Sequence, residues 1–288
     1  MIANASTSPA ETPPMLVTAP DGPAIVVHEW GNPRGSELLL IHGVAQSHLC
    51  FARQFGSELA REHRIIAYDV RGHGGSDKPL GSEFYTDGKR WADEVQAVIG
   101  AKELLRPVLV GWSLGGRIGA QYLLHHGDAR LSGVNFVASR AIPDKRFSGP
   151  ASLGLPQVEP RDLAGHIAMA KVFLRGCYHR QPADEDFATQ LAYNMLAPLE
   201  VRTAIRAWPA DLARTTAALA AVQVPVLVTH GRQDTIVLPA VAELVAATIP
   251  GARLSWYEDC GHSPFWEDSE RFNRELAAFA AAAWRPDA

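Results

Sequence analysis

A serine between two glycines is the strongest chemical signal in this sequence. It is Ser113, in the segment Gly-Trp-Ser-Leu-Gly at 111–115, which follows the apolar run Pro107–Val110 and precedes the helical pattern Leu114–His125. A sharp turn from strand to helix would expose the hydroxyl, and it leaves little room for side chains on either side. The helix N-terminus would also place amide donors where negative charge develops. We predict that Ser113 is a nucleophile; the alternative is an ordinary helix-capping serine in a glycine-rich turn.

A serine hydroxyl is a weak nucleophile unless a base takes its proton and a carboxylate orients that base. His262 fits the base, because it follows Gly261 in a loop after the last apolar run of the chain. Asp234 lies just beyond another apolar run, Val224–Thr229, and its carboxylate could accept the Nδ1 proton of the histidine. The sequence therefore predicts a triad of Ser113, His262 and Asp234, although a satisfied core histidine and a turn-capping aspartate would look similar.

Two backbone amides are candidates for holding the oxyanion that acyl transfer creates. One belongs to Val44, which follows the apolar run and the His-Gly pair at 38–43, and the other belongs to Leu114, directly after the serine. His42 is expected to brace its loop rather than to move protons. The glycine-rich turn 69–77 lacks the Gly-Lys-Ser/Thr of a phosphate-binding loop, and it is predicted to support the same edge of the sheet.

The chain has three cysteines, Cys50, Cys177 and Cys260, whose spacing and number suggest neither a zinc motif nor a disulfide framework. A reducing compartment is the simplest expectation, so we predict a cytoplasmic protein. Cys260 lies two residues before His262, but Ser113 is the better nucleophile, and the thiol is expected to fill space in its loop.

Bulk composition places the chain among globular proteins. Of its 288 residues, 47% are hydrophobic and 20% are charged, and the formal net charge is −4 at pH 7. This small negative charge gives no reason to expect nucleic acid or an anionic membrane surface as a partner, and no run is long enough to span a bilayer. Residues 1–14 are rich in Ser, Thr, Pro and Ala, carry no secretory-signal pattern and are predicted to form a disordered tail.

Short apolar runs rich in β-branched residues predict buried strands, and helical patterns lie between many of them. The predicted strands are Ala24–Glu29, Leu38–His42, Arg64–Tyr68, Pro107–Val110, Gly133–Ala138, Val224–Thr229 and Arg253–Tyr257. The predicted helices between them are Ser47–Arg61, Tyr85–Ile99, Leu114–His125 and Pro239–Thr248. Runs that are apolar throughout are typical of parallel strands covered on both faces, so the pattern predicts a doubly wound α/β sheet.

The alternation stops between residues 141 and 220, where strand signals are weak and helical patterns recur. These patterns are Leu163–Leu174, Asp184–Leu196 and Pro198–Ala207. We predict a helical cap over residues 141–220, inserted into an α/β core that is formed by 15–140 and 221–288.

Five motifs, in this order, resemble those of the α/β-hydrolase superfamily. They are His42-Gly43, the DxRGHGxSD segment Asp69–Asp77, the GxSxGG segment Gly111–Gly116, the GxxD segment Gly231–Asp234, and Gly261-His262. The resemblance covers about residues 15 to 285. It implies the α/β-hydrolase fold, with a mostly parallel eight-stranded sheet and a helical lid inserted after the sixth strand. It also implies the roles given above for the triad and the two amides.

Within this superfamily the serine narrows the chemistry. Epoxide hydrolases and haloalkane dehalogenases resemble this chain but carry aspartate where it has Ser113. Esterases, enol-lactonases, carbon–carbon hydrolases and cofactor-free perhydrolases keep the serine, and the segments 42–47 and 71–77 look most similar to the first two. We therefore expect an esterase or lactonase that forms an acyl-enzyme and needs no metal or organic cofactor. A carbon–carbon bond hydrolase, a perhydrolase or haloperoxidase, and a non-catalytic ligand-binding protein remain alternatives.

Aromatic residues beside the triad are candidates for the walls of a substrate pocket. Trp112 precedes the serine, and Phe265 and Trp266 follow the base, although Trp112 could equally pack in the core. The cap sequence is apolar and rich in alanine, with few clustered charges, so we expect a small to medium, largely apolar ester or lactone. Formation of a homo-oligomer is left open.

Overall fold

The computed structural model describes residues 11–159 and 161–284, and its strands form one eight-stranded sheet in the order β1-β2-β4-β3-β5-β6-β7-β8. The strands are β1 (Glu11–Thr18), β2 (Ala24–Gly31), β3 (Ser36–Ile41), β4 (His63–Tyr68), β5 (Val108–Trp112), β6 (Gly133–Val137), β7 (Val226–Gly231) and β8 (Arg253–Tyr257). Strand β2 is antiparallel to both of its neighbours, whereas every pair from β4 to β8 is parallel. The expected mostly parallel α/β sheet is confirmed.

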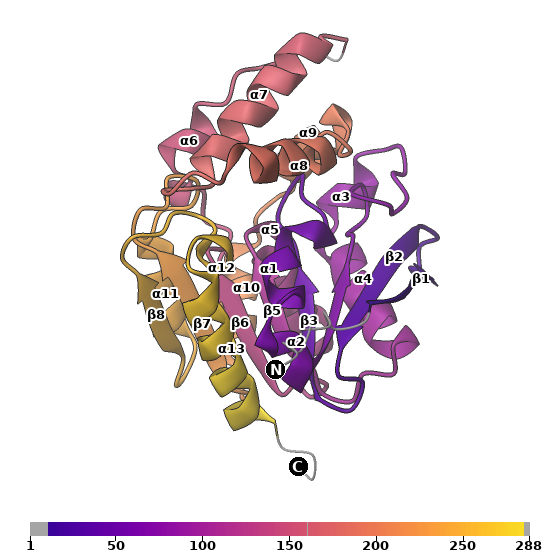
Figure 1. Cartoon of the computed structure of the whole chain (residues 1–288), viewed down its shortest axis with the longest axis vertical. Helices are drawn as coiled ribbons and strands as arrows, with labels where there is room; N and C mark the ends of the chain where they lie inside the picture. The colour runs from indigo at the N-terminus through magenta and orange to yellow at the C-terminus, as the bar shows by residue number, and fades with distance from the viewer. Residues whose placement is uncertain (1–10, 160, 285–288) are drawn as a thin grey trace, which may run out of the picture.

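Helices cover both faces of the sheet (Figure 1). They are η1 (His48–Phe51), α1 (Ala52–Phe55), α2 (Glu58–Glu62), α3 (Glu83–Thr86), α4 (Gly88–Ala101), α5 (Leu114–His126), α10 (Leu212–Ala220), α11 (Ala240–Thr248), α12 (Pro264–Glu267) and α13 (Ser269–Ala283). Helices α1, α2 and α13 pack together on one face, and α4, α5, α10 and α11 pack in series on the other. Connections between parallel strands are right-handed. A helix that leads to a new strand on one side of the sheet therefore lies on the opposite face from a helix that leads to a new strand on the other side.

The direction in which strands are added to the sheet reverses at β3. After β3 the chain crosses to β4 on one side, and it then returns so that β5 pairs with the other side of β3. In open α/β sheets, ligands bind at the carboxyl ends of the strands beside such a reversal. Val44 follows β3 and Ser113 follows β5, so the fold brings these two predicted site residues to the same crevice.

Strand β1 differs from the sequence-based expectation, which placed residues 11–14 in a disordered tail. Its two prolines cannot donate to a strand ladder, and they therefore weaken the strand signal in the sequence. An edge position tolerates them, and the register with β2 shifts between Thr12 and Met15, where they lie. The remainder of the predicted tail, residues 1–10, lies outside the described residues.

The cap lies above the carboxyl ends of the strands (Figure 1). Its helices are η2 (Lys145–Phe147), α6 (Pro150–Leu153), α7 (Leu163–Gly176), α8 (Asp184–Asn194) and α9 (Leu199–Ala207). Helix α10 falls inside the predicted cap range 141–220, but it packs against α5 and α11 on the face of the sheet. It is therefore part of the core layer, and the helices above the sheet end with α9.

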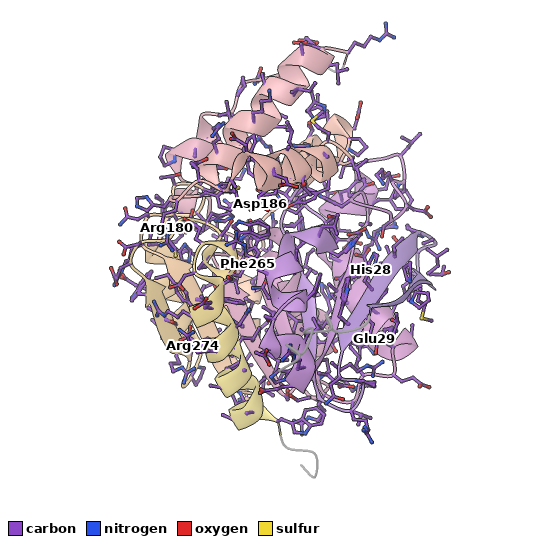
Figure 2. All side chains as sticks on the ribbon, in the orientation of Figure 1. His28, Glu29, Arg180, Asp186, Phe265 and Arg274 are labelled. Carbon is purple, nitrogen blue, oxygen red and sulfur yellow. The ribbon has the colours of Figure 1, made fainter. Side chains whose placement is uncertain are left out.

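Polar contacts tie the cap to the core, and Figure 2 shows Asp186 and Arg180 at this junction. Arg53 of α1 donates to the carbonyl of Trp266 at 2.7 Å and lies 3.5 Å from Asp186 of α8. The Glu267 carboxylate accepts the backbone N–H of Arg180 at 2.8 Å. None of the described helices combines the length and the apolar character that crossing a membrane requires.

Candidate active site

Ser113 lies on the sharp turn between β5 and α5, with φ 55° and ψ −112°. This left-handed conformation strains a residue that has a side chain, and such strain is typical of functional positions. A Cβ on Gly111 would lie 2.5 Å from the Gly115 carbonyl oxygen, and one on Gly115 would lie 2.1 Å from the Ile41 oxygen. Both glycines are therefore required by close backbone contacts, which is the physical reason for their spacing around the serine.

A buried carboxylate holds the predicted base. Asp234 Oδ2 lies 2.7 Å from His262 Nδ1, while Oδ1 accepts the backbone N–H groups of Ile236 at 2.8 Å and Val237 at 2.9 Å. Burial alone would raise the pKa of Asp234, but the contacts with the imidazoles outweigh it and hold the pKa below its ordinary value. The carboxylate is thus ionised, and His262 donates from Nδ1.

The other ring nitrogen of His262 is open. Nε2 is buried, and no hydrogen-bond partner is found for it among the described residues. With the Nδ1 proton donated to Asp234, the neutral ring has its lone pair on Nε2. The ring can therefore accept a proton from a hydroxyl brought within reach.

His230 is a contact that the sequence analysis missed. Its Nε2 lies 3.0 Å from Asp234 Oδ2 and 3.0 Å from the Val237 carbonyl oxygen. Both of these atoms are acceptors, so Nε2 carries a proton and donates toward them. The signal available in the sequence was its position four residues before Asp234, at the end of β7.

Trp112 positions the base instead of lining a pocket. Its indole Nε1 donates to the His262 carbonyl at 2.8 Å, and its ring packs edge-on against Phe265 at 4.8 Å between centroids. Phe265 is buried, and Trp266 lies under the Arg53 guanidinium at 4.3 Å. None of the three predicted wall aromatics lies on the cavity beside Ser113, because each is used in packing.

The loop after β3 lies against the nucleophile. A Cβ on Gly43 would be 3.2 Å from the Cβ of Ser113, and Val44, Ser113 and Leu114 line the same cavity. His42 braces this loop as expected: Nδ1 donates to the Gly43 carbonyl at 2.8 Å, and Nε2 accepts the Val70 N–H at 3.0 Å. Burial lowers the pKa of His42 to about 4, so this brace is neutral.

A cavity of about 640 Å³ opens between the cap and the turn from β5 to α5, which we call the elbow. Apolar residues form part of its wall, namely Met169, Phe173, Leu199, Ile205, Trp208, Ile236 and Val237. Cationic residues form another part, namely Arg117, Arg140, Lys145, Arg202 and Arg206. The expectation of a largely apolar pocket was drawn from charge density along the cap sequence, and it missed cations that converge only in the fold.

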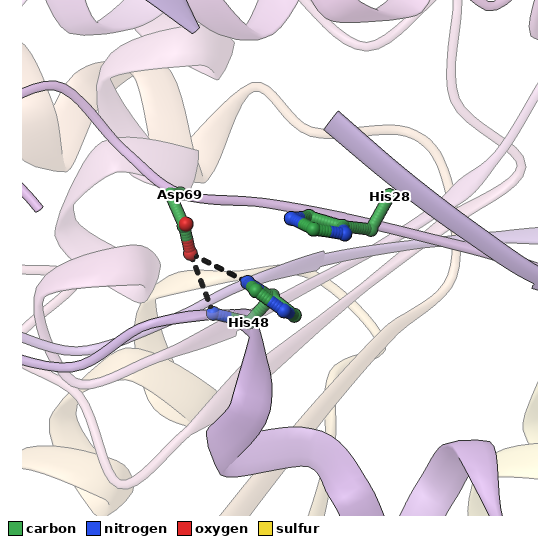
Figure 3. A group of neighbouring side chains, drawn as sticks. All are labelled: His28, His48 and Asp69. Carbon is green, nitrogen blue, oxygen red and sulfur yellow. Dashed lines mark hydrogen bonds and ion pairs between the residues drawn. The ribbon is translucent and has the colours of Figure 1, made fainter. Parts of the chain in front are cut away.

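The glycine-rich turn supports the site through Asp69 (Figure 3). Asp69 Oδ1 accepts the His48 N–H at 2.8 Å and lies 2.9 Å from His48 Nδ1, while Oδ2 accepts the Gly75 N–H at 2.8 Å. His28, His48 and Asp69 bring possible metal-ligand atoms within 4.8 Å of one another. The two imidazoles stack at 3.5 Å between centroids, so one ion cannot lie in both ring planes. We assign this group a structural role.

Cys260 is buried beside the His262 loop, and burial raises the pKa of its thiol to about 11. A neutral thiol is a poor nucleophile. The position therefore fits packing, as the sequence led us to expect.

Comparison with known proteins identifies the family. The family described as alpha/beta hydrolase fold matches residues 38–269. The chain belongs to the α/β-hydrolase superfamily. Among solved structures, this α/β-hydrolase is similar to a proposed aryl esterase from Burkholderia cenocepacia, with 36% identity, coverage of 94% of this chain and 99% of that chain, and a TM-score of 0.88.

Two further relatives are described as different kinds of hydrolase. An esterase from Rhodococcus sp. ECU1013 is 29% identical, with coverage of 94% and 99% of the two chains and a TM-score of 0.84. The 2-hydroxymuconate semialdehyde hydrolase of Pseudomonas sp. CF600 is 27% identical over 259 residues, which are 86% of this α/β-hydrolase and 88% of the relative.

Proposed function

We propose that this α/β-hydrolase cleaves a small to medium carboxylic ester or lactone through a covalent acyl-enzyme on Ser113. The observation that carries the proposal is the Asp234–His262 pair, held at 2.7 Å with an open Nε2. Trp112 hydrogen-bonds to the His262 carbonyl, and the next residue, Ser113, is strained and lines a cavity. A base with an orienting carboxylate and a nucleophile at a helix N-terminus together provide acyl-transfer chemistry.

In the proposed mechanism, His262 Nε2 takes the Ser113 proton while Oγ attacks the ester carbonyl carbon. The Val44 and Leu114 amides donate to the oxyanion, and the positive end of α5 adds to this stabilisation. The tetrahedral intermediate collapses, the alcohol leaves with the proton from His262, and the acyl group stays on Oγ. Water, deprotonated by His262, then releases the acid.

The size of the cavity and the cap above it support a small to medium substrate. A cavity of about 640 Å³ is within the range that holds a single small molecule, and a cap above it favours such a substrate over a polymer. Two of the similar solved structures are described as esterases, which supports ester cleavage.

A carbon–carbon bond hydrolase on the same triad is the second candidate. The similarity to the 2-hydroxymuconate semialdehyde hydrolase favours it. Such an enzyme would turn over a vinylogous diketone much faster than a simple ester, so both substrates belong in one assay.

The decisive test is intact-mass spectrometry after treatment with a fluorophosphonate probe, together with a panel of 4-nitrophenyl esters from acetate to laurate. We expect one adduct on Ser113, its loss in Ser113→Ala, and a fall in kcat of several orders of magnitude in that variant. A matched control is Ser152→Ala, which removes another serine of the cavity wall and should keep the adduct. Folded protein with neither an adduct nor ester turnover would contradict the proposal.

A further inference from the structure

The cavity beside Ser113 gathers positive charge from separate segments of the chain. Arg117 comes from the first turn of α5, Arg140 and Lys145 follow β6, and Arg202 and Arg206 lie one turn apart on α9. Among the described residues of the wall, Glu159 is the one carboxylate, and it is exposed. The wall is therefore strongly cationic, although the whole chain has a formal net charge of −4.

Arg117 is held in place but not neutralised. Its Nη2 donates to the carbonyls of Trp208 at 3.1 Å and Pro209 at 2.8 Å, and the guanidinium lies 3.8 Å from the centroid of the Trp208 ring. Its Nε is buried, and the described residues offer it no hydrogen-bond partner. Two backbone carbonyls thus fix the side chain of this cavity-lining residue, and no carboxylate neutralises its charge.

Arg202 and Arg140 are likewise held by neutral hydrogen-bond acceptors and not by carboxylates. Arg202 is buried and donates to the Ala197 carbonyl at 3.1 Å and to Asn194 Oδ1 at 2.8 Å. Arg140 donates to Ser148 Oγ at 2.7 Å. Within the described part of the chain, no carboxylate oxygen lies within 4.0 Å of the guanidinium of Arg117, Arg140 or Arg202.

The Asp144 carboxylate, which pairs with Arg146, also attracts Arg140, but burial outweighs this attraction and the pKa of Arg140 is lowered. Burying cations without a paired counter-charge is unfavourable, because each loses hydration and repels the next. Burial, followed by repulsion from Arg140, lowers the pKa of Arg117 to about 9, and burial followed by Arg206 lowers the pKa of Arg202 to about 10. A bound anion would relieve both effects. An unrelieved cost beside the nucleophile indicates a ligand group of opposite charge.

We propose that the substrate of this hydrolase carries a carboxylate remote from the scissile ester, and that the Arg117–Arg140–Arg202–Arg206 wall binds it. The inference rests on the proposed function and deepens it. Planar guanidinium groups with free donors match a carboxylate better than a neutral group does. The apolar residues of the same wall would pack against the carbon chain that joins the carboxylate to the ester.

The test compares two esters that differ only in charge, the mono(4-nitrophenyl) ester of adipic acid and the 4-nitrophenyl ester of adipic acid monoamide. We expect kcat/KM of the wild type to favour the carboxylate ester about tenfold or more, and added salt to reduce this preference. Arg117→Gln and Arg206→Gln should each lower the ratio of the two kcat/KM values several-fold. Arg214→Gln, which removes an exposed arginine of α10 outside the cavity, should leave the ratio unchanged.

Failure of this inference is distinguishable from failure of the proposed function. Equal kcat/KM for the two esters in the wild type would overturn the carboxylate site and leave the serine hydrolase intact. Absence of hydrolysis and of probe labelling would overturn the hydrolase instead. In that case the rise in Tm caused by adipate decides the site: a rise that Arg117→Gln abolishes supports it, and no rise refutes it.

Discussion

At the scale of single residues, Asp234 connects the two histidines on which the site depends. It accepts hydrogen bonds from two backbone amides and lies within 3.0 Å of both imidazoles, so it is fully satisfied as an anion. Contacts with the imidazoles hold the pKa of Asp234 below its ordinary value, so the carboxylate is ionised at neutral pH. The charge in turn fixes the Nδ1 proton of His262 and leaves Nε2 as the base.

Asp234→Asn should therefore lower kcat for 4-nitrophenyl acetate by roughly 10⁴-fold. The amide of asparagine can donate to Nδ1, which moves the ring proton to Nε2 and removes the base. The matched control is Asp259→Asn, an exposed aspartate in the loop that carries the histidine, which should retain kcat within about twofold. Near-normal turnover of Asp234→Asn would mean that another group orients His262.

The sequence could predict Ser113, Asp234 and His262 as a group because each follows a predicted strand, and parallel strands end at the same edge of a sheet. It could not predict the cationic wall, because Arg117 and Arg202 are 85 positions apart and meet only when the cap folds over α5. For Trp112 the sequence suggested a pocket role that the structure does not show. A position next to the nucleophile suggested a pocket wall, but side chains on successive residues of a strand point to opposite faces.

At the scale of elements, the strands β2 to β8 were predictable, whereas the edge strand β1 and the breaks between helices were not. The pattern Ser47–Arg61 suggests one helix, but helix α1 ends at Phe55. Helix α2 begins after Ser57, whose side chain accepts the Leu59 N–H. Likewise, Asp87 interrupts the predicted helix Tyr85–Ile99 and caps α4. Apolar periodicity continues across a capped break, so it reports which face is buried and not where the helix begins.

The connection between β5 and α5 allows a test with paired glycine substitutions. Gly115→Ala places a Cβ 2.1 Å from the Ile41 oxygen, so the elbow must shift. We expect a loss of more than about 2 kcal/mol in the free energy of unfolding and a loss of most esterase activity. Gly100→Ala is the control: nothing lies within 4 Å of its added Cβ on α4, and it should stabilise by about 0.5 kcal/mol.

Urea unfolding and 4-nitrophenyl acetate hydrolysis measure both quantities on the same preparations. If Gly115→Ala kept both stability and activity, the close approach of α5 to the end of β3 would not be required for the nucleophile turn.

At the scale of the whole molecule, buried neutral histidines join the ends of strands that are far apart in sequence. His42 links the loop after β3 to the loop after β4 through its bonds to Gly43 and Val70. His73 is buried close by, and its Nδ1 donates to the Arg71 carbonyl at 2.9 Å. Burial, followed by repulsion from His42, lowers the pKa of His73 to about 3. The folded state thus depends on both rings staying uncharged.

This dependence predicts how stability changes with pH. Both folded pKa values lie below the unfolded value of about 6.5, so the unfolded chain takes up protons first as the pH falls. The stabilisation is complete above about pH 6.5. It is lost down to about pH 4 for His42 and about pH 3 for His73, and on the order of 3 kcal/mol from each histidine is lost by pH 4. Urea unfolding at pH 7.5, 6, 5 and 4.5 should show a steep fall in the free energy of unfolding.

The fall should be shallower in His73→Asn and unchanged in His179→Asn, which replaces an exposed histidine. A free energy that stays constant over this range would show that the histidines are charged in the folded protein, or that the buried sites admit water.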